Sequence, residues 1–222
     1  MEIKTAIMNR HSIRGYSSRP VSKEVLKEVL TLAGRAVSSV NCQPWEFAVI
    51  TGEVLQRVSS EIVECFEQGE PADLSPWFGE GIYRSRRQEI GKQLFAAMEI
   101  SRDNLEKRRW WTARGYRFFD APVAILLMMD KSADEASCRL DMGCVIQNIC
   151  LAAMEFGLGT CVEYQGVSYL EPLRRNLTCA QGKRFVCAIA VGYPDEDFPA
   201  NHVVSKRVSV DDITSWYGFE EN

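Results

Sequence analysis

Apolar residues recur at regular spacings along most of the chain and predict an alternation of helices and strands. Between residues 21 and 36, the spacing of Val25 and Val29 is that of an amphipathic helix, and Ser22 can cap its first turn. The same helical spacing returns over residues 54–66. Both segments should therefore pack one apolar face against a core.

Three further helices are predicted. The longest covers residues 136–156 and ends at Gly157. Its candidate buried residues are Leu140, Cys144, Ile149 and Ala153. A helix over residues 168–176 should open with a capping box formed by Ser168 and Glu171. A short apolar helix is expected near the start of the chain, at Ile3, Ala6 and Ile7.

Two nearly continuous apolar runs, residues 123–129 and 185–191, predict strands that are buried on both faces at the centre of a sheet. A shorter run over residues 47–50 predicts a third strand, which ends at the Thr51-Gly52 turn. Strands interleaved with helices predict a layered sheet of the α/β or α+β class.

Two stretches do not fit this alternation. Residues 68–116 begin as a loop rich in glycine and proline, and from about residue 85 they have helical spacing with many aromatic residues and arginines. The tail after residue 194 resembles a loop but ends in the apolar residues Ile213, Trp216, Tyr217 and Phe219. Because such residues do not stay ordered in solvent, they should cover this subunit's own core or a partner's.

Composition narrows the class of protein. A chain of 222 residues, 46% hydrophobic, can form a single domain with a substantial core. A net charge of −4 argues against general nucleic-acid binding, which needs a basic face. The longest apolar run, residues 121–129, is about half of what a membrane-spanning helix needs. The first residues lack a secretory signal, so we expect a cytoplasmic protein.

The eight cysteines predict neither a metal site nor a disulfide framework. No Cys-x-x-Cys spacing occurs, and the only two histidines, His11 and His202, are far apart in the sequence. Cys144, Cys150 and Cys187 fall within helix or strand patterns, where a thiol packs as a small apolar group. We therefore expect structural thiols in a reducing compartment.

Two segments have the chemistry to bind a phosphorylated heteroaromatic ligand. Residues 10–14 (Arg-His-Ser-Ile-Arg) combine two guanidinium groups with a hydroxyl, and the Lys206-Arg207 pair adds cations near the other end. Residues 38–45 (Ser-Ser-Val-Asn-Cys-Gln-Pro-Trp) offer hydroxyls and amides that suit the polar edge of a flat ring. Pro44 excludes helical geometry at Gln43, so we expect an extended loop.

Together these segments resemble the FMN-dependent nitroreductase family. Its members open with an Arg-x-Ser-x-Arg/Lys element and continue with a Pro-Ser-Ser-x-Asn-x-Gln-Pro-Trp loop; here Val37 replaces the first proline. Residues 156–161 look like the family's Gly-Leu-Gly-Thr turn, and residues 192–194 look like its Gly-Tyr-Pro strand, ahead of the second clamp at Lys206. The resemblance extends over about residues 4–210.

The resemblance implies an α+β fold with α/β-type layers, in which helices flank a central mixed β-sheet. It also implies one domain over residues 1–222 with a helical lid at 68–116, and an intertwined homodimer that exchanges C-terminal arms, residues 194–222. FMN would be the cofactor and NAD(P)H the electron donor. The implied cofactor-binding residues are Arg10, His11, Ser12, Arg14, Ser38, Ser39, Asn41, Gln165, Gly166, Lys206 and Arg207.

The implied reaction is ping-pong hydride transfer to a small aromatic acceptor, a nitroaromatic or a quinone. No side chain would be catalytic, because the flavin N5 atom carries the chemistry. The lid would choose the substrate, through candidate residues Trp77, Tyr83, Trp110, Trp111 and Arg114. Two alternatives stay open: reductive dehalogenation or enone reduction on the same scaffold, and a non-catalytic flavin-binding redox sensor that uses Cys42 or Cys161.

Overall fold

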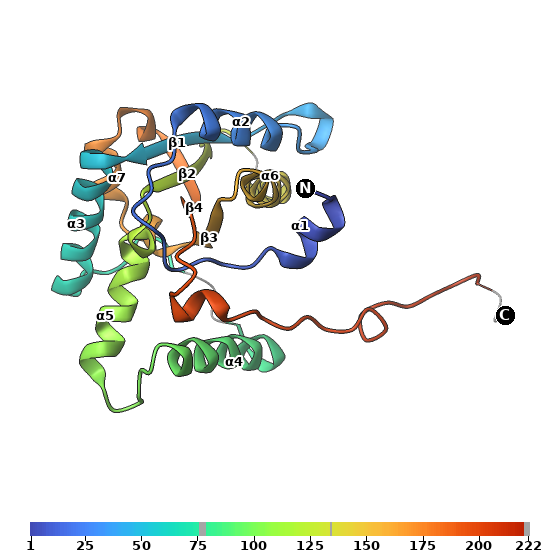
Figure 1. Cartoon of the computed structure of the whole chain (residues 1–222). Coiled ribbons are helices and arrows are strands. Elements are labelled where there is room, and N and C mark those ends of the chain that lie inside the picture. The colour runs from blue at the N-terminus through green and yellow to red at the C-terminus, as the bar shows by residue number, and fades with distance from the viewer. Residues whose placement is uncertain (76–78, 134, 220–222) are drawn as a thin grey trace.

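The computed structural model describes residues 1–75, 79–133 and 135–219 (Figure 1). At its centre lies one sheet, whose strands follow the order β1 (Glu46–Thr51), β2 (Val123–Asp130), β4 (Lys183–Gly192) and β3 (Gly159–Glu163). The helices are α1 (Ile3–Asn9), α2 (Lys23–Ala33), α3 (Gly52–Gln68), α4 (Gly81–Ala97), α5 (Leu105–Tyr116), α6 (Glu135–Glu155) and α7 (Leu170–Asn176). The α+β class is confirmed.

The strands β2 and β4 occupy the centre of the sheet, as their apolar sequences predict. The strand β3 was not predicted, because it is short and follows directly on a glycine turn. All neighbouring strands pair antiparallel, whereas the family resemblance implied a mixed sheet. Apolar runs indicate that a strand is buried but not its direction. A parallel bridge also joins Ser12, which lies outside the named strands, to Thr160 of β3.

Helices cover both faces of the sheet (Figure 1). Along β2, Ile125 and Leu127 pack with α2 and α6, while Leu126 and Met128 pack with α3 and α7. This division follows from the two-residue period of a strand, which sends alternate side chains to opposite faces. The centre of the sheet is therefore buried on both faces.

Two local predictions are wrong in detail. In α6, Ile149 is fully buried, but Leu140 is 74% exposed and Cys144 only half-buried. The buried face of α6 passes through Met142, and Leu140 lies about 200° around the helix from it. In α7, the predicted capping box does not form, and Ser168 lies before the helix.

A distant carboxylate replaces that box. The N–H of Leu170 donates to Asp73 Oδ2 at 2.8 Å. The helix therefore begins where a loop far away in the sequence supplies an acceptor for one of its free N–H groups.

The insertion and the tail take different courses. The helices α4 and α5 meet the 199–202 turn in a small cluster of Ile100, Trp111 and Ala200. Beyond residue 203 the chain leaves the body as an extended arm (Figure 1). Trp216 on that arm is 61% exposed. Among the described residues, no helix is both long enough and apolar enough to cross a bilayer.

Candidate active site

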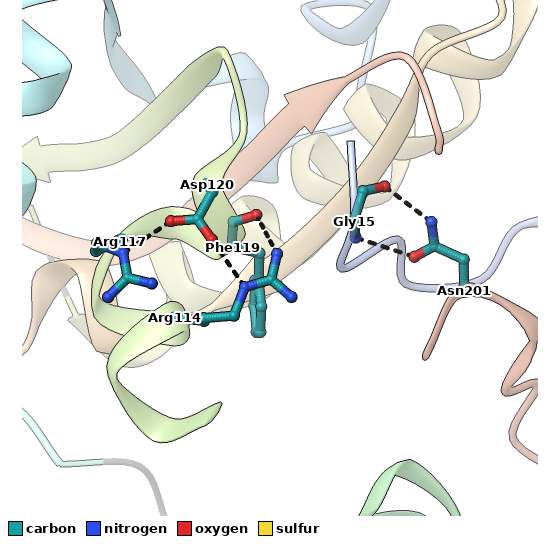
Figure 2. Close-up of polar contacts among 6 residues, drawn as sticks. All are labelled: Gly15, Arg114, Arg117, Phe119, Asp120 and Asn201. Carbon is teal, nitrogen blue, oxygen red and sulfur yellow. Dashed lines mark hydrogen bonds and ion pairs between the residues drawn. The ribbon is translucent and has the colours of Figure 1, made fainter. Parts of the chain in front are cut away.

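The N-terminal segment, residues 10–15, is fixed between β3 and the 199–202 turn. The N–H of Ile13 donates to the Thr160 carbonyl at 2.9 Å. Asn201 Oδ1 accepts the N–H group of Arg14 at 2.7 Å. The same oxygen accepts the Gly15 N–H at 3.1 Å, and Asn201 Nδ2 donates to the Gly15 carbonyl at 2.8 Å (Figure 2). Asn201 is buried, so these bonds stay shielded from water. Sequence reasoning missed this residue because its role depends on a distant segment.

His11 belongs to the same arrangement. One ring nitrogen lies 2.8 Å from the Asn9 carbonyl oxygen, and the other lies 2.9 Å from that of Asn201. Both contacts orient the ring toward the backbone of this chain. The structure therefore places His11 where it holds the segment that carries Arg10 and Ser12.

One cavity of about 360 Å³ brings several predicted site residues together. Its lining residues are Arg14, Leu94, Trp111, Thr112, Phe119, Cys161, Val162, Glu163, Tyr164 and Gln165. A guanidinium group, aromatic rings and a polar turn thus meet at one end of β3. These groups suit a flat ligand that carries both polar and negatively charged atoms.

The turn after β3 forms the polar wall of this cavity. The side-chain amide of Gln165 donates to the Thr112 carbonyl on α5 at 3.0 Å. The N–H of Gly166 donates to Glu163 Oε2 at 2.7 Å. A Cβ atom on Gly166 would lie 2.1 Å from the Phe118 ring, so only glycine fits this position. Packing and hydrogen bonds therefore fix the backbone that the family resemblance places opposite a flavin.

Glu163 is a buried acid in the cavity wall that sequence reasoning missed. It is 7% exposed, and within the described part of the chain its Oε1 atom has no hydrogen-bond partner. Burial raises the pKa of Glu163 to about 8, against the opposing effect of the Gly166 and Gln165 N–H groups. The carboxyl group is therefore mostly protonated near pH 7. A single acidic residue directly after the short uncharged stretch of residues 158–162 is the signal available in the sequence.

The Ser38–Gln43 loop lies elsewhere on the same subunit. Ser39 and Asn41 are exposed, and neither they nor Ser38 line the 360 Å³ cavity. Gln43 has φ of 46° and is not extended as predicted. Pro44 excludes only the right-handed helical region there. The left-handed conformation lets the Gln43 N–H donate to Ser38 Oγ at 3.1 Å.

The second cationic pair faces a different space. Lys206 and Arg207 are exposed and line a cavity of about 750 Å³ with residues of α4, among them Glu89. His11 lines a third cavity, of about 320 Å³, which reaches Val204 on the arm. The arm thus starts beside the N-terminal segment. The meeting of both cationic segments on one phosphate stays a prediction.

The order of these motifs and the geometry of the 360 Å³ cavity agree with a comparison against family models. The model described as the nitroreductase family matches residues 7–193. The chain belongs to the nitroreductase family.

Individual relatives agree with this assignment over nearly the whole chain. The nitrobenzene nitroreductase of Ectopseudomonas oleovorans is 33% identical over 96% of both chains, and the chloronitrobenzene nitroreductase of Comamonas testosteroni is 34% identical over 96% of both. Among solved structures, the FMN-dependent nitroreductase NfnB of Mycobacterium smegmatis, in complex with NADPH, superimposes with a TM-score of 0.90. It is 25% identical and covers 96% of this chain and 97% of that one.

The predicted lid residues of this nitroreductase-family chain differ in how deeply they are buried. Trp77 lies outside the described residues. Tyr83 and Trp110 are 56% and 43% exposed, whereas Trp111 is buried beside the cavity. Arg114 is buried too, and an ion pair of 2.8 Å joins its Nε to Asp120 (Figure 2).

Further contacts surround the Arg114 guanidinium. Its Nη2 donates to the Phe119 carbonyl at 3.1 Å (Figure 2). Its Cζ atom lies 4.5 Å from the Phe198 ring centroid. Its Nη1 atom is buried without a hydrogen-bond partner among the residues described. In this conformation Arg114 joins α5 to the segments around it.

Neither candidate sensor thiol is activated. Burial raises the pKa of Cys161 to about 11, and hydrogen bonding to Asp141 raises the pKa of Cys42. Reactive cysteines instead have lowered pKa values. This observation argues against the redox-sensor alternative.

Proposed function

We propose that the protein is an FMN-dependent NAD(P)H oxidoreductase that reduces nitroaromatic or quinone-type acceptors by ping-pong hydride transfer. One observation carries the proposal: Arg14, from the Arg-x-Ser-x-Arg element, and the Glu163–Gln165 turn line one cavity, and both lie within the residues that the family model matches. The relatives' names, nitrobenzene nitroreductase and chloronitrobenzene nitroreductase, support a nitroaromatic acceptor. Bound FMN would supply the hydride chemistry at its N5 atom.

The chain's own residues would bind the cofactor, orient it and shield it from water. The guanidinium of Arg14 would stabilise negative charge on a ligand in the cavity. Arg10, Ser12 and the Lys206-Arg207 pair would hold the phosphate. Trp111, Phe119 and Tyr164 would exclude water.

The turn beyond Glu163 has two roles in this proposal. The backbone at Gln165 and Gly166 would face the reacting edge of the ring. Glu163 holds a proton beside this turn, at a carboxyl group that packing keeps out of water.

We further propose that the functional unit is a homodimer. The exposed Ser38–Gln43 loop does not line its own subunit's cavity, so it would complete the partner's site. The exposed apolar side chains of the arm, such as Trp216 and Phe219, would be buried against the second subunit. All eight cysteines are free, which supports a reducing compartment and hence a cytoplasmic location.

The test is anaerobic reduction of the purified protein by NADH and, separately, by NADPH, followed by reoxidation with an acceptor panel. We expect a yellow dimer whose colour is bleached by at least one nucleotide and restored fastest by nitrobenzene or a quinone. A halophenol or an enone as the best acceptor would favour the other reductive activities. A yellow protein that neither nucleotide bleaches would be a sensor, and a protein that does not bind FMN would contradict the whole proposal.

A further inference from the structure

A cluster of three potential metal ligands lies away from the 360 Å³ cavity, where the Ser38–Gln43 loop meets α6. Cys42, Cys138 and Asp141 each place one ligand atom within 4.8 Å of the other two. Cys42 Sγ lies 3.2 Å from Asp141 Oδ2. Cys138 and Asp141 are three residues apart on α6 and therefore share one helix face.

The burial of Asp141 requires compensation. Asp141 is only 5% exposed. None of the ion pairs formed by the described residues includes its carboxylate. Its carboxylate accepts instead from the Ser39 N–H at 3.2 Å and from the Cys42 thiol. A buried carboxylate is stable only when it is paired, hydrogen-bonded or bound to a metal.

The surrounding geometry also favours an ion. The Ser39 N–H contacts Asp141 Oδ1, which leaves Oδ2 directed toward the Cys42 thiol. Such a hydrogen bond to a ligating carboxylate orients it toward a metal. Within a single subunit Cys42 is exposed, whereas Cys138 is buried, so an ion reaches the cluster from the loop side before the loop meets a partner.

We propose that Cys42, Cys138 and Asp141 form a zinc-type metal site that fastens the loop to α6. Two thiolates and one carboxylate are ligands that Zn²⁺ accepts, and three protein ligands leave a fourth position for water or another ligand. Binding replaces both thiol protons, which leave to solvent.

The backbone of the Ser38–Gln43 loop is strained at several residues. Val40 has φ of 45°, which is unfavourable for a β-branched residue, and Asn41 and Gln43 also have positive φ. Backbone of this kind persists only when surrounding contacts hold it. An ion bridging the loop and α6 would supply such contacts. This inference does not require that FMN bind.

The test uses full-length protein that has been treated with a reductant and a chelator and then freed of both. Zn²⁺ is titrated by calorimetry, and Co²⁺ is followed by its ligand-field bands at wavelengths longer than the absorption of oxidised flavin. We expect one ion per chain with a tetrahedral cobalt spectrum. Cys42→Ser and Asp141→Asn should each weaken binding at least about tenfold. Cys179→Ser, which changes an exposed cysteine outside the cluster, should leave binding unchanged.

Folding is controlled by comparing circular dichroism of all variants, and Zn²⁺ should raise the Tm of the wild type and of Cys179→Ser but not of Cys42→Ser. Absence of stoichiometric binding by the wild type would overturn the proposal. So would equal binding by Cys42→Ser and Cys179→Ser. A Cys42–Cys138 disulfide that forms under mild oxidation, in a protein that binds no Zn²⁺ when reduced, would replace the metal site with a thiol switch.

Discussion

The N-terminal segment, residues 10–15, and the C-terminal arm, residues 203–219, both carry cations that the family motifs assign to phosphate, yet their surroundings differ. The first is held by Asn201 and by β3 through buried hydrogen bonds. The second is almost entirely exposed and displays apolar side chains such as Trp216 to solvent. One half of the candidate site is therefore held by its own subunit, whereas the other lies largely free of contacts with that subunit.

The difference is clearest for two tryptophans. Trp111 is 8% exposed, so Trp111→Ala should lower the free energy of unfolding of the subunit by about 3–5 kcal/mol. Trp216 is 61% exposed, so Trp216→Ala should change the stability of the monomer by no more than about 0.5 kcal/mol. It should nevertheless weaken dimerisation at least about tenfold. Urea unfolding and sedimentation at several concentrations separate the two effects. Equal destabilisation of the monomer by both substitutions would contradict the predicted difference between the two tryptophans.

Asn201→Ala tests how the N-terminal segment is held. The substitution leaves the N–H groups of Arg14 and Gly15 without their acceptor in a buried position, so we expect a loss of about 2–3 kcal/mol in unfolding free energy and weaker flavin retention. Asn148→Ala is the control, since it removes only a 3.4 Å hydrogen bond to the Ala33 carbonyl. Equal, small effects of both variants in urea unfolding would show that Asn201 does not organise this segment.

Arg207→Ala tests the second clamp on the exposed arm. Because Arg207 is exposed, its loss should leave unfolding unchanged within about 0.5 kcal/mol. The loss of one charge-assisted phosphate contact should weaken FMN binding about ten- to hundredfold. Arg102→Ala, which changes an exposed arginine that lines neither the 360 Å³ nor the 750 Å³ cavity, is the control. Full flavin content in purified Arg207→Ala protein would show that Arg207 does not bind the FMN phosphate.

Glu163→Gln tests the buried acid of the half that is held by its own subunit. Its pKa in the folded protein, about 8, lies above its ordinary value of 4.5, so between these values the folded chain holds a proton that the unfolded chain has released. Stability from this group is therefore complete at low pH and is lost as the pH rises toward 8.

We expect the wild type to lose about 1 kcal/mol more unfolding free energy than Glu163→Gln between pH 7 and pH 8. Urea unfolding at both pH values measures the difference. Glu135→Gln, a change at an exposed ion pair, serves as the control. Parallel pH profiles of wild type and Glu163→Gln would show that Glu163 is charged in the folded protein.

Much of the fold could be predicted because its signals are local. The apolar runs at residues 123–129 and 185–191 each specify a buried strand through a few adjacent side chains, and Ser22 caps α2 as predicted. The family motifs are equally local, so they indicate the site's chemistry without a structure. Leu140 shows the limit, since helical spacing does not specify which faces of a long helix are covered.

The sequence by itself determined the family, the core strands and most of the candidate cofactor residues. Only the tertiary structure showed that Asn201 holds residues 14 and 15, that Glu163 is buried with an unpartnered oxygen, and that Cys42 lies beside Cys138 and Asp141. Each of these depends on residues distant in sequence, or on burial from several directions. Burial and proximity determine the charge of a carboxyl group and the ligands available to an ion, and neither quantity is encoded in local spacing.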